Sequence, residues 1–275
     1  MAYDSFIAED GTQLKRRSWP AGDRPKATVV IAHGIAEHGG RYAWVAAQLN
    51  AAGYAVETLD ARGHGESGGT RVLIRSVGDL ARDYGAFCDG LLTEGHTPLF
   101  MLGHSLGSLV VIQAALTRQK SIAGVILSGN ALDGRNNLPP PAIPILHVLA
   151  RLIPNARLLP GLAAKDVNTD PAVVEAYDND PLVDRGRWRV ATGSAIMKAI
   201  KIARDSLYAL NVPLLVIHGD KDRMLNIAGA HFAMEQAASA DKELLVCPGE
   251  FHEPLTGLTR ESTIAALIAW LDRHV

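Results

Sequence analysis

The chain has 275 residues, of which 48% are hydrophobic and 20% charged, so it is long and apolar enough for one large α/β domain with an insertion. This composition excludes a disordered chain. A formal net charge of −2, without a long basic block, argues against a nucleic-acid partner.

The first half of the chain alternates predicted strands and helices. Residues 3–9 and 13–19 resemble two strands joined by a tight turn at Asp10-Gly11, which would form an antiparallel sheet edge. From residue 28 to 128, continuous apolar runs of strand length alternate with stretches of helical apolar spacing. The predicted fold is therefore α/β, with a mostly parallel central sheet flanked by helices.

Residues 98–117, PLFMLGHSLGSLVVIQAALT, predict a strand, a sharp turn and a helix, with Ser105 at the turn. Small residues are needed on both sides of such a nucleophile elbow, and Gly103 and Gly107 meet that need. A G-x-S-x-G pattern alone is a weak signal. The apolar strand before it and the apolar helix after it make it stronger.

The alternation stops at Asn130. Residues 129–211 are too long for an ordinary connection, and their proline and helical apolar spacing predict a helical cap inserted after the sixth strand. The core domain would then comprise residues 1–128 and 212–275. Within the cap, Ile143, Leu146 and Leu149 belong to an apolar run that is too short and too broken by proline to span a bilayer. This run packs over the sheet or forms a lid that accepts acyl chains or contacts a membrane.

Two further residues suit a serine nucleophile. Asp222 and His252 each lie in a loop after a predicted parallel strand, where open α/β sheets place their sites. His252 would take the proton of Ser105, and Asp222 would orient the imidazole. Asp220 and Asp133 are rival acids at neighbouring positions, while His64, between two glycines, favours a structural role.

The glycine-rich loop His33-Gly34-Ile35-Ala36-Glu37 follows another buried strand. In a hydrolase with the order serine, acid, histidine, this loop supplies one oxyanion-hole amide and the residue after the nucleophile supplies the other. Those donors would be the N–H groups of Ile35 and Leu106.

At this point the chain resembles the serine α/β-hydrolases, and within them the monoacylglycerol lipases and lysophospholipase-like enzymes. The stretches that carry the resemblance are HGIAEHGGRY, LDARGHGESGG, GHSLGS, NTDPAVVEAYDNDPLV, HGDKDRM and FHE. It implies the α/β-hydrolase fold, Ser105, Asp222 and His252 as the triad, and Glu37 and Arg41 in a polar pocket for glycerol or a similar alcohol. The alternative for Glu37 and Arg41 is an ion pair that fixes the loop. A second histidine found after the catalytic one in some relatives is missing, because the chain continues Glu253-Pro254-Leu255.

The resemblance implies hydrolysis of a monoacylglycerol to fatty acid and glycerol through an acyl-enzyme, with no metal and no cofactor. A lysophospholipase, a general carboxylesterase, an aminopeptidase and a non-catalytic ligand-binding protein are the alternatives. The partner would be a small lipid or ester. Transient contact of the cap with a membrane or micelle is a further possibility that the sequence does not decide. The sequence specifies no oligomeric state. The N-terminal stretch has no signal-peptide apolar core, so we expect a cytoplasmic protein.

Overall fold

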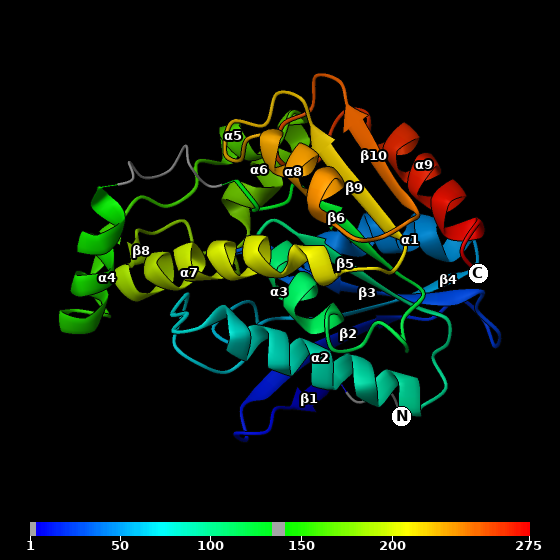
Figure 1. Cartoon of the computed structure of the whole chain (residues 1–275), viewed down its shortest axis with the longest axis horizontal. Coiled ribbons are helices and arrows are strands. Elements are labelled where there is room, and N and C mark those ends of the chain that lie inside the picture. Colours follow the sequence, from blue (N-terminus) through cyan, green and yellow to red (C-terminus); the bar gives the residue numbers. More distant parts are fainter. Residues whose placement is uncertain (1–3, 134–140) are drawn as a thin grey trace.

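A computed structural model describes residues 4–133 and 141–275. Its main feature is an eight-stranded sheet in the order β1-β2-β4-β3-β5-β6-β9-β10 (Figure 1). The strands are β1 (Ser5–Ile7), β2 (Gln13–Trp19), β3 (Ala27–Ala32), β4 (Tyr54–Leu59), β5 (Leu99–His104), β6 (Gly124–Ser128), β9 (Leu214–Gly219) and β10 (Lys242–Cys247). β2 pairs antiparallel with both β1 and β4, and all other neighbours in the sheet pair in parallel. This confirms the predicted α/β-hydrolase architecture with its antiparallel edge.

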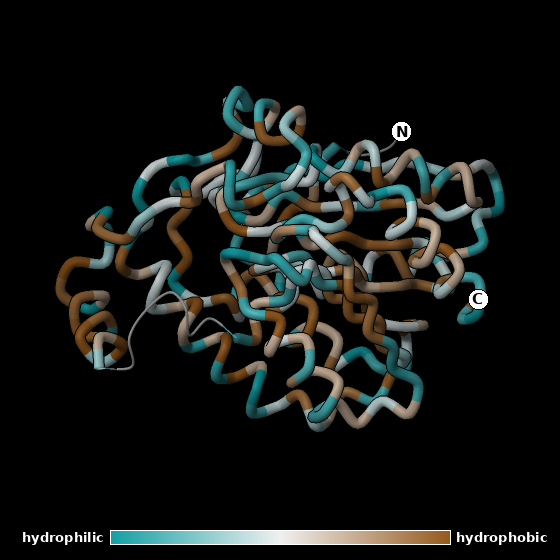
Figure 2. The backbone as a smooth tube through the Cα atoms, turned by 90° about the horizontal axis from the view of Figure 1, so that it is seen from above, coloured by the Kyte–Doolittle hydropathy of each residue, from teal (hydrophilic) through white to brown (hydrophobic). Residues whose placement is uncertain are grey.

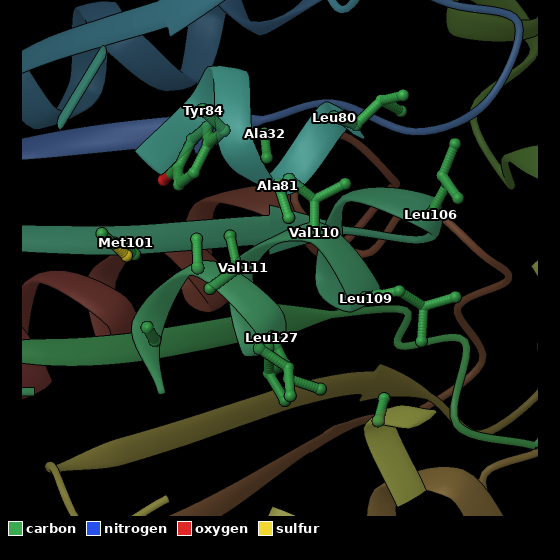
Figure 3. Packing of buried hydrophobic residues seen from close by; sticks show 14 of the residues in the cluster. Ala32, Leu80, Ala81, Tyr84, Met101, Leu106, Leu109, Val110, Val111 and Leu127 are labelled. Atoms are coloured by element: carbon green, nitrogen blue, oxygen red, sulfur yellow. The ribbon is translucent and has the colours of Figure 1, made fainter. Parts of the chain in front are cut away.

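Helices cover both faces of this sheet. The helices that connect or follow its strands are α1 (Ala43–Ala51), preceded by the 3₁₀ turn η1 (Gly39–Tyr42), α2 (Val77–Thr93), α3 (Leu106–Ala115), α8 (Ala228–Gln236) and α9 (Arg260–Asp272). α1 and α9 share one buried apolar cluster with one face of the sheet, and α2, α3 and α8 share another with the opposite face. Figure 3 shows Leu109, Val110 and Val111 of α3 among residues of α2 and the central strands. Their burial fixes α3, and therefore the turn at its start, against the sheet.

The segment between β6 and β9 holds the remaining elements of the described chain. They are α4 (Ala142–Leu152), β7 (Arg157–Leu159), α5 (Ala164–Val167), α6 (Pro171–Asn179), β8 (Trp188–Arg189), α7 (Val190–Ser206) and the 3₁₀ turn η2 (Leu207–Ala209). β7 and β8 form a small antiparallel ribbon, which the sequence did not predict. Small buried residues of α7, Ala195, Ala199 and Ala203, pack into the same cluster as α3. The division into a core and a cap at residues 129 and 211 remains a prediction.

The later part of this segment is fastened to the loops at the end of the sheet. The N–H of Asp184 donates to the carbonyl of Ala36 at 2.9 Å, and the N–H of Glu253 donates to the carbonyl of Val167 at 3.1 Å. α4 instead packs on α7 at the far end of the molecule (Figure 1).

α4 presents an apolar surface to solvent. Ile145, Val148 and Leu152 are 61%, 54% and 72% exposed, and the end of the molecule that α4 forms is coloured largely hydrophobic in Figure 2. Among the residues that the structure describes, no helix is both long enough and apolar enough to cross a membrane.

Candidate active site

Ser105 lies at a strained turn between β5 and α3. Its φ of 52° and ψ of −119° fall in a region that residues with side chains rarely occupy, at a cost of about 1–3 kcal/mol. The flanking glycines permit this turn. A methyl group added at Gly103 would lie 2.3 Å from the carbonyl oxygen of Gly107, and one added at Gly107 would lie 2.0 Å from that of Ala32. Close packing of β3, β5 and α3 thus presents the serine at the carboxyl edge of the sheet.

The structure brings His252 and Asp222 into direct contact. His252 Nδ1 lies 2.8 Å from Asp222 Oδ2, while Asp222 Oδ1 accepts the N–H groups of Met224 at 2.8 Å and Leu225 at 3.0 Å. The carboxylate is therefore held at both oxygens. Because Nδ1 donates to the carboxylate, the free lone pair of a neutral imidazole is on Nε2.

His252 also lies beside the serine turn. Its ring centroid is 4.9 Å from that of His104, the residue before Ser105. His252 Nε2 is buried and has no hydrogen-bond partner among residues 4–133 and 141–275, so it is not bonded to Ser105 either. Catalytic hydrogen bonds of this kind commonly tighten only in the substrate complex.

The rival residues are placed differently. Asp220 Oδ1 accepts the N–H of Gly249 at 2.7 Å and so braces a turn beyond β10. Asp133 is buried after β6. His64 is buried against His33, with ring centroids 5.4 Å apart. The acid in contact with His252 is Asp222.

Charge and burial act in opposite directions on this pair. Burial lowers the pKa of His252, but the Asp222 carboxylate, assisted by Glu253 and Glu37, outweighs it and raises the pKa above its ordinary value. Burial raises the pKa of Asp222, but His252, together with the Leu225 N–H and His218, outweighs that effect and lowers it. The site therefore favours a charged imidazole paired with a carboxylate, the ion pair that forms when a serine proton is transferred.

The two amides predicted to bind an oxyanion lie on either side of Ser105. A methyl group added at Gly34 would be only 3.2 Å from Ser105 Cβ, which places the Ile35 loop against the serine. Leu106 is the first residue of α3, so no carbonyl of its own helix can accept its N–H. Ile35 and Leu106 both line a cavity with Ser105.

That cavity is apolar and has a volume of about 190 Å³. Its walls between β6 and β9 come from Leu159, Leu162, Trp188, Gly193, Ile196, Met197 and Ile200. The predicted acyl-chain residues Ile143, Leu146 and Leu149 are not among its lining residues and instead lie on α4. Sequence reasoning missed these lining residues. Four of them, Gly193, Ile196, Met197 and Ile200, have the spacing of one face of α7.

A second, more polar cavity has a volume of about 350 Å³, and its lining includes His104 and Glu253, the neighbours of Ser105 and His252 in the sequence. It is lined by Glu37, Arg41, Tyr42, His104 and Glu253, among others. The Arg41 guanidinium binds Glu37 and forms a two-pronged pair with Glu253, at 2.5 and 2.9 Å. The predicted pair therefore both lines a pocket and fixes its loop. No local pattern in the sequence indicates that Glu253 completes this group of charges.

Burial raises the pKa of Glu37, but Arg41 and the nearby histidines outweigh it and lower the pKa to about 2. Glu37 is therefore ionised at neutral pH. Within the described residues, no group of three or more His, Cys, Asp or Glu side chains could hold a metal ion.

Comparisons with known proteins agree with this geometry. The sequence profile of the family described as serine aminopeptidase, S33, matches residues 23–258. A monoacylglycerol lipase of Mycolicibacterium smegmatis is 34% identical over 98% of this chain and 97% of its own length. The human monoglyceride lipase is 31% identical over 90% of this chain and 82% of its own length.

Solved structures give the same picture. The crystal structure of the monoacylglycerol lipase of Paleococcus ferrophilus superposes with a TM-score of 0.85 at 30% identity, over 95% of this chain and 99% of that one. A soluble variant of the monoglyceride lipase of Saccharomyces cerevisiae, in complex with a substrate analog, has the same fold, with a TM-score of 0.85 at 24% identity over 97% and 93% of the two chains. The chain therefore belongs to the serine α/β-hydrolase family described as serine aminopeptidase, S33, together with the monoacylglycerol lipases that it resembles.

Proposed function

We propose that this enzyme hydrolyses monoacylglycerols to fatty acid and glycerol, with Ser105 as the nucleophile. The observation that carries the proposal is a pair of cavities: an apolar one whose lining includes Ser105, and a more polar one whose lining includes His104. An ester with one acyl chain and one small polar alcohol matches both. The names of the relatives support the same substrate class.

The proposed reaction proceeds in two steps. His252 Nε2 takes the proton of the Ser105 hydroxyl as its oxygen attacks the ester carbonyl, and the N–H groups of Ile35 and Leu106 stabilise the oxyanion. The intermediate then collapses, the bond to the glycerol oxygen breaks, and His252 returns the proton to that oxygen. Water next attacks the acyl-enzyme with His252 as base again, which releases the fatty acid and restores Ser105.

Glycerol would occupy the polar cavity. Glu37 and Arg41 line it, together with Tyr42 and Glu253. Because Arg41 is already paired with both carboxylates, we assign it and Glu37 to shaping the cavity and fixing its charge. The polar groups of the substrate would then meet a rigid wall rather than mobile charges.

The carboxylates of this cavity argue against an aminopeptidase. Such an enzyme needs acidic oxygens free to bind a substrate ammonium group. Glu37 accepts from Gly34, Tyr42 and Arg41, and both oxygens of Glu253 accept from Arg41. Glu37 and Glu253 are therefore already occupied by donors of the protein itself, and Asp180, which also lines the cavity, is paired with His38 at 2.8 Å.

A matched substrate panel tests the proposal. Mono-, di- and triacylglycerols of several chain lengths, a lysophospholipid, a simple ester and an aminoacyl amide are compared under one condition, with Ser105→Ala as control. We expect the highest kcat/KM on monoacylglycerols and loss of all turnover in Ser105→Ala. A preference for the lysophospholipid, the simple ester or the amide would refute monoacylglycerol as the substrate class. Turnover by Ser105→Ala would refute the assignment of Ser105 as the nucleophile.

We also propose that α4 makes transient contact with a membrane or micelle. Its exposed residues Ile145, Val148 and Leu152 would enter the lipid interface, from which a monoacylglycerol is taken up. Leu152→Ser should weaken sedimentation with phospholipid vesicles. Leu258→Ser is the matched control, since Leu258 is 68% exposed but lies before α9. Equal binding of both variants would refute this contact.

A further inference from the structure

His33 lies at the end of β3 and is fully enclosed, with only 4% of its surface exposed. Both of its ring nitrogens are hydrogen-bonded. The Ala61 N–H donates to His33 Nε2 at 2.9 Å, and His33 Nδ1 lies 2.7 Å from the carbonyl oxygen of Gly34. An Nε2 that accepts a backbone N–H carries no proton, so the proton is on Nδ1 and is donated to Gly34. The ring is thus a neutral imidazole in one defined tautomer.

This bond fixes the direction of the next peptide. In a trans peptide the C=O and N–H groups point in opposite directions. The carbonyl of Gly34 and the N–H of Ile35 belong to one such unit, so holding the carbonyl toward His33 turns the Ile35 N–H away from it. No acceptor for that N–H occurs in the described part of the chain. Ile35 and Ser105 line the same apolar cavity.

The neighbouring peptides of the loop are held as well. The N–H of Gly34 donates to Glu37 Oε1 at 2.5 Å, and the carbonyl of Ala36 accepts the N–H of Asp184 at 2.9 Å. Ala36 has a φ of 65°, which a non-glycine residue adopts only where surrounding contacts hold it. The loop is therefore restrained on both sides of Ile35, and His33 is the side chain that restrains the Gly34–Ile35 unit itself.

We propose that His33 is a positioning residue of the oxyanion hole, which aims the Ile35 N–H by holding the carbonyl of the same peptide. This inference rests on the proposed function, since it takes Ile35 as an oxyanion donor. His33 touches no reacting atom. Its effect would appear in the transition state, where the N–H must meet the developing oxyanion. Burial lowers the pKa of His33 and so preserves the neutral ring that can accept from Ala61.

Two isosteric substitutions separate the two bonds of His33. Asparagine places an amide N–H near the position of Nδ1, so His33→Asn keeps a donor for Gly34 and loses the acceptor for Ala61. Glutamine places an oxygen near the position of Nε2, so His33→Gln does the reverse. His64→Gln is the control, because His64 is also a buried histidine of this region, but its Nδ1 lies 3.1 Å from the carbonyl oxygen of Arg62 and its ring packs against the His33 ring.

The readouts are kcat and KM on a short-chain ester, the inhibition constant of an alkyl boronic acid that forms a tetrahedral adduct with Ser105, and the Tm. Loss of one oxyanion donor costs about 10²–10³ in kcat, so we expect His33→Gln to lose about 10- to 100-fold with little change in KM. The inhibition constant of the boronic acid should rise by a similar factor in the same variant. His33→Asn and His64→Gln should retain most of kcat even where the Tm falls.

Equal losses of kcat in His33→Asn and His33→Gln, or a loss that follows the Tm across all three variants, would overturn the inference. If the variants fail to fold, a measurement on the wild-type enzyme tests the same inference: ¹⁵N NMR should find the His33 ring neutral and protonated on Nδ1. An Nε2-protonated or charged ring would also overturn it. Failure of the wild-type enzyme to hydrolyse any ester would instead refute the proposed function, and the two results are distinguishable.

Discussion

Replacement of Asp222 by asparagine should remove almost all activity while the fold remains intact. Asp222 Oδ1 accepts two backbone N–H groups, from Met224 and Leu225, so in Asp222→Asn the amide oxygen must keep that position. The amide NH₂ then faces His252 Nδ1, in place of the oxygen that lies 2.8 Å away. His252 can meet this donor only with the proton on Nε2, and in that tautomer it cannot accept the proton of Ser105.

The expected loss is about 10⁴-fold in kcat, the effect of the wrong tautomer in a serine triad. This corresponds to about 5 kcal/mol of transition-state stabilisation. The assay is initial-rate hydrolysis of a short-chain ester at neutral pH, with the Tm as a test of folding. Asp220→Asn is the matched control, since Asp220 braces Gly249 and should change kcat by less than about threefold. A loss of less than tenfold in a folded Asp222→Asn enzyme would refute the assignment of Asp222.

Three further predictions follow from the same geometry. His252 must be neutral to act as a base, and its pKa is raised. We therefore expect kcat/KM to fall as the pH is lowered through an apparent pKa above the ordinary imidazole value of about 6.5. A pH–rate profile whose acid limb lies below that value would contradict this prediction. Gly103→Ala should destabilise the fold by about 2–4 kcal/mol or prevent folding, because the added methyl group would clash with the backbone of Gly107. Gly90→Ala is the control: it adds a methyl group in open space on α2 and should stabilise the fold by up to about 1 kcal/mol. Urea denaturation measures both free energies of unfolding, and similar effects of the two variants would contradict the packing of the turn. Ile196→Trp should fill the apolar cavity and shift preference toward shorter acyl chains, measured as kcat/KM across a chain-length series; an unchanged preference would remove this cavity from acyl binding.

The parts of this molecule that could be predicted from its sequence are those that local patterns determine. Ser105 between two glycines, with an apolar strand before it and an apolar helix after it, predicts the turn that the structure contains. The parallel pairing of the strands from β3 to β6 also agrees with the predicted alternation of strands and helices. The choice of Asp222 over Asp220 was already favoured by its greater distance from the strand.

The remainder depends on contacts that sequence spacing does not encode. The apolar pattern of α4 left three roles open, a cover over the sheet, a lid for acyl chains and a membrane contact. In the structure Ile145, Val148 and Leu152 of α4 are exposed, and residues of α7 line the cavity that contains Ser105. Amphipathic spacing shows that a helix has an apolar side, but not what that side meets. Likewise, the pairing of Arg41 with Glu253 joins residues 212 positions apart, and only the folded chain brings them together.

The two parts of the segment between β6 and β9 differ in how they are attached to the rest of the molecule, and this difference affects which parts of such an enzyme can change in evolution. Asp184 and Val167 tie its later part to the loops that hold Ile35 and His252, whereas α4, in the described part of the chain, packs mainly on α7. Mutations in the attached part would therefore disturb the loops of the catalytic site, whereas replacement of α4 would leave those loops in place. A lineage could adapt the same catalytic centre to new interfaces by replacing one helix.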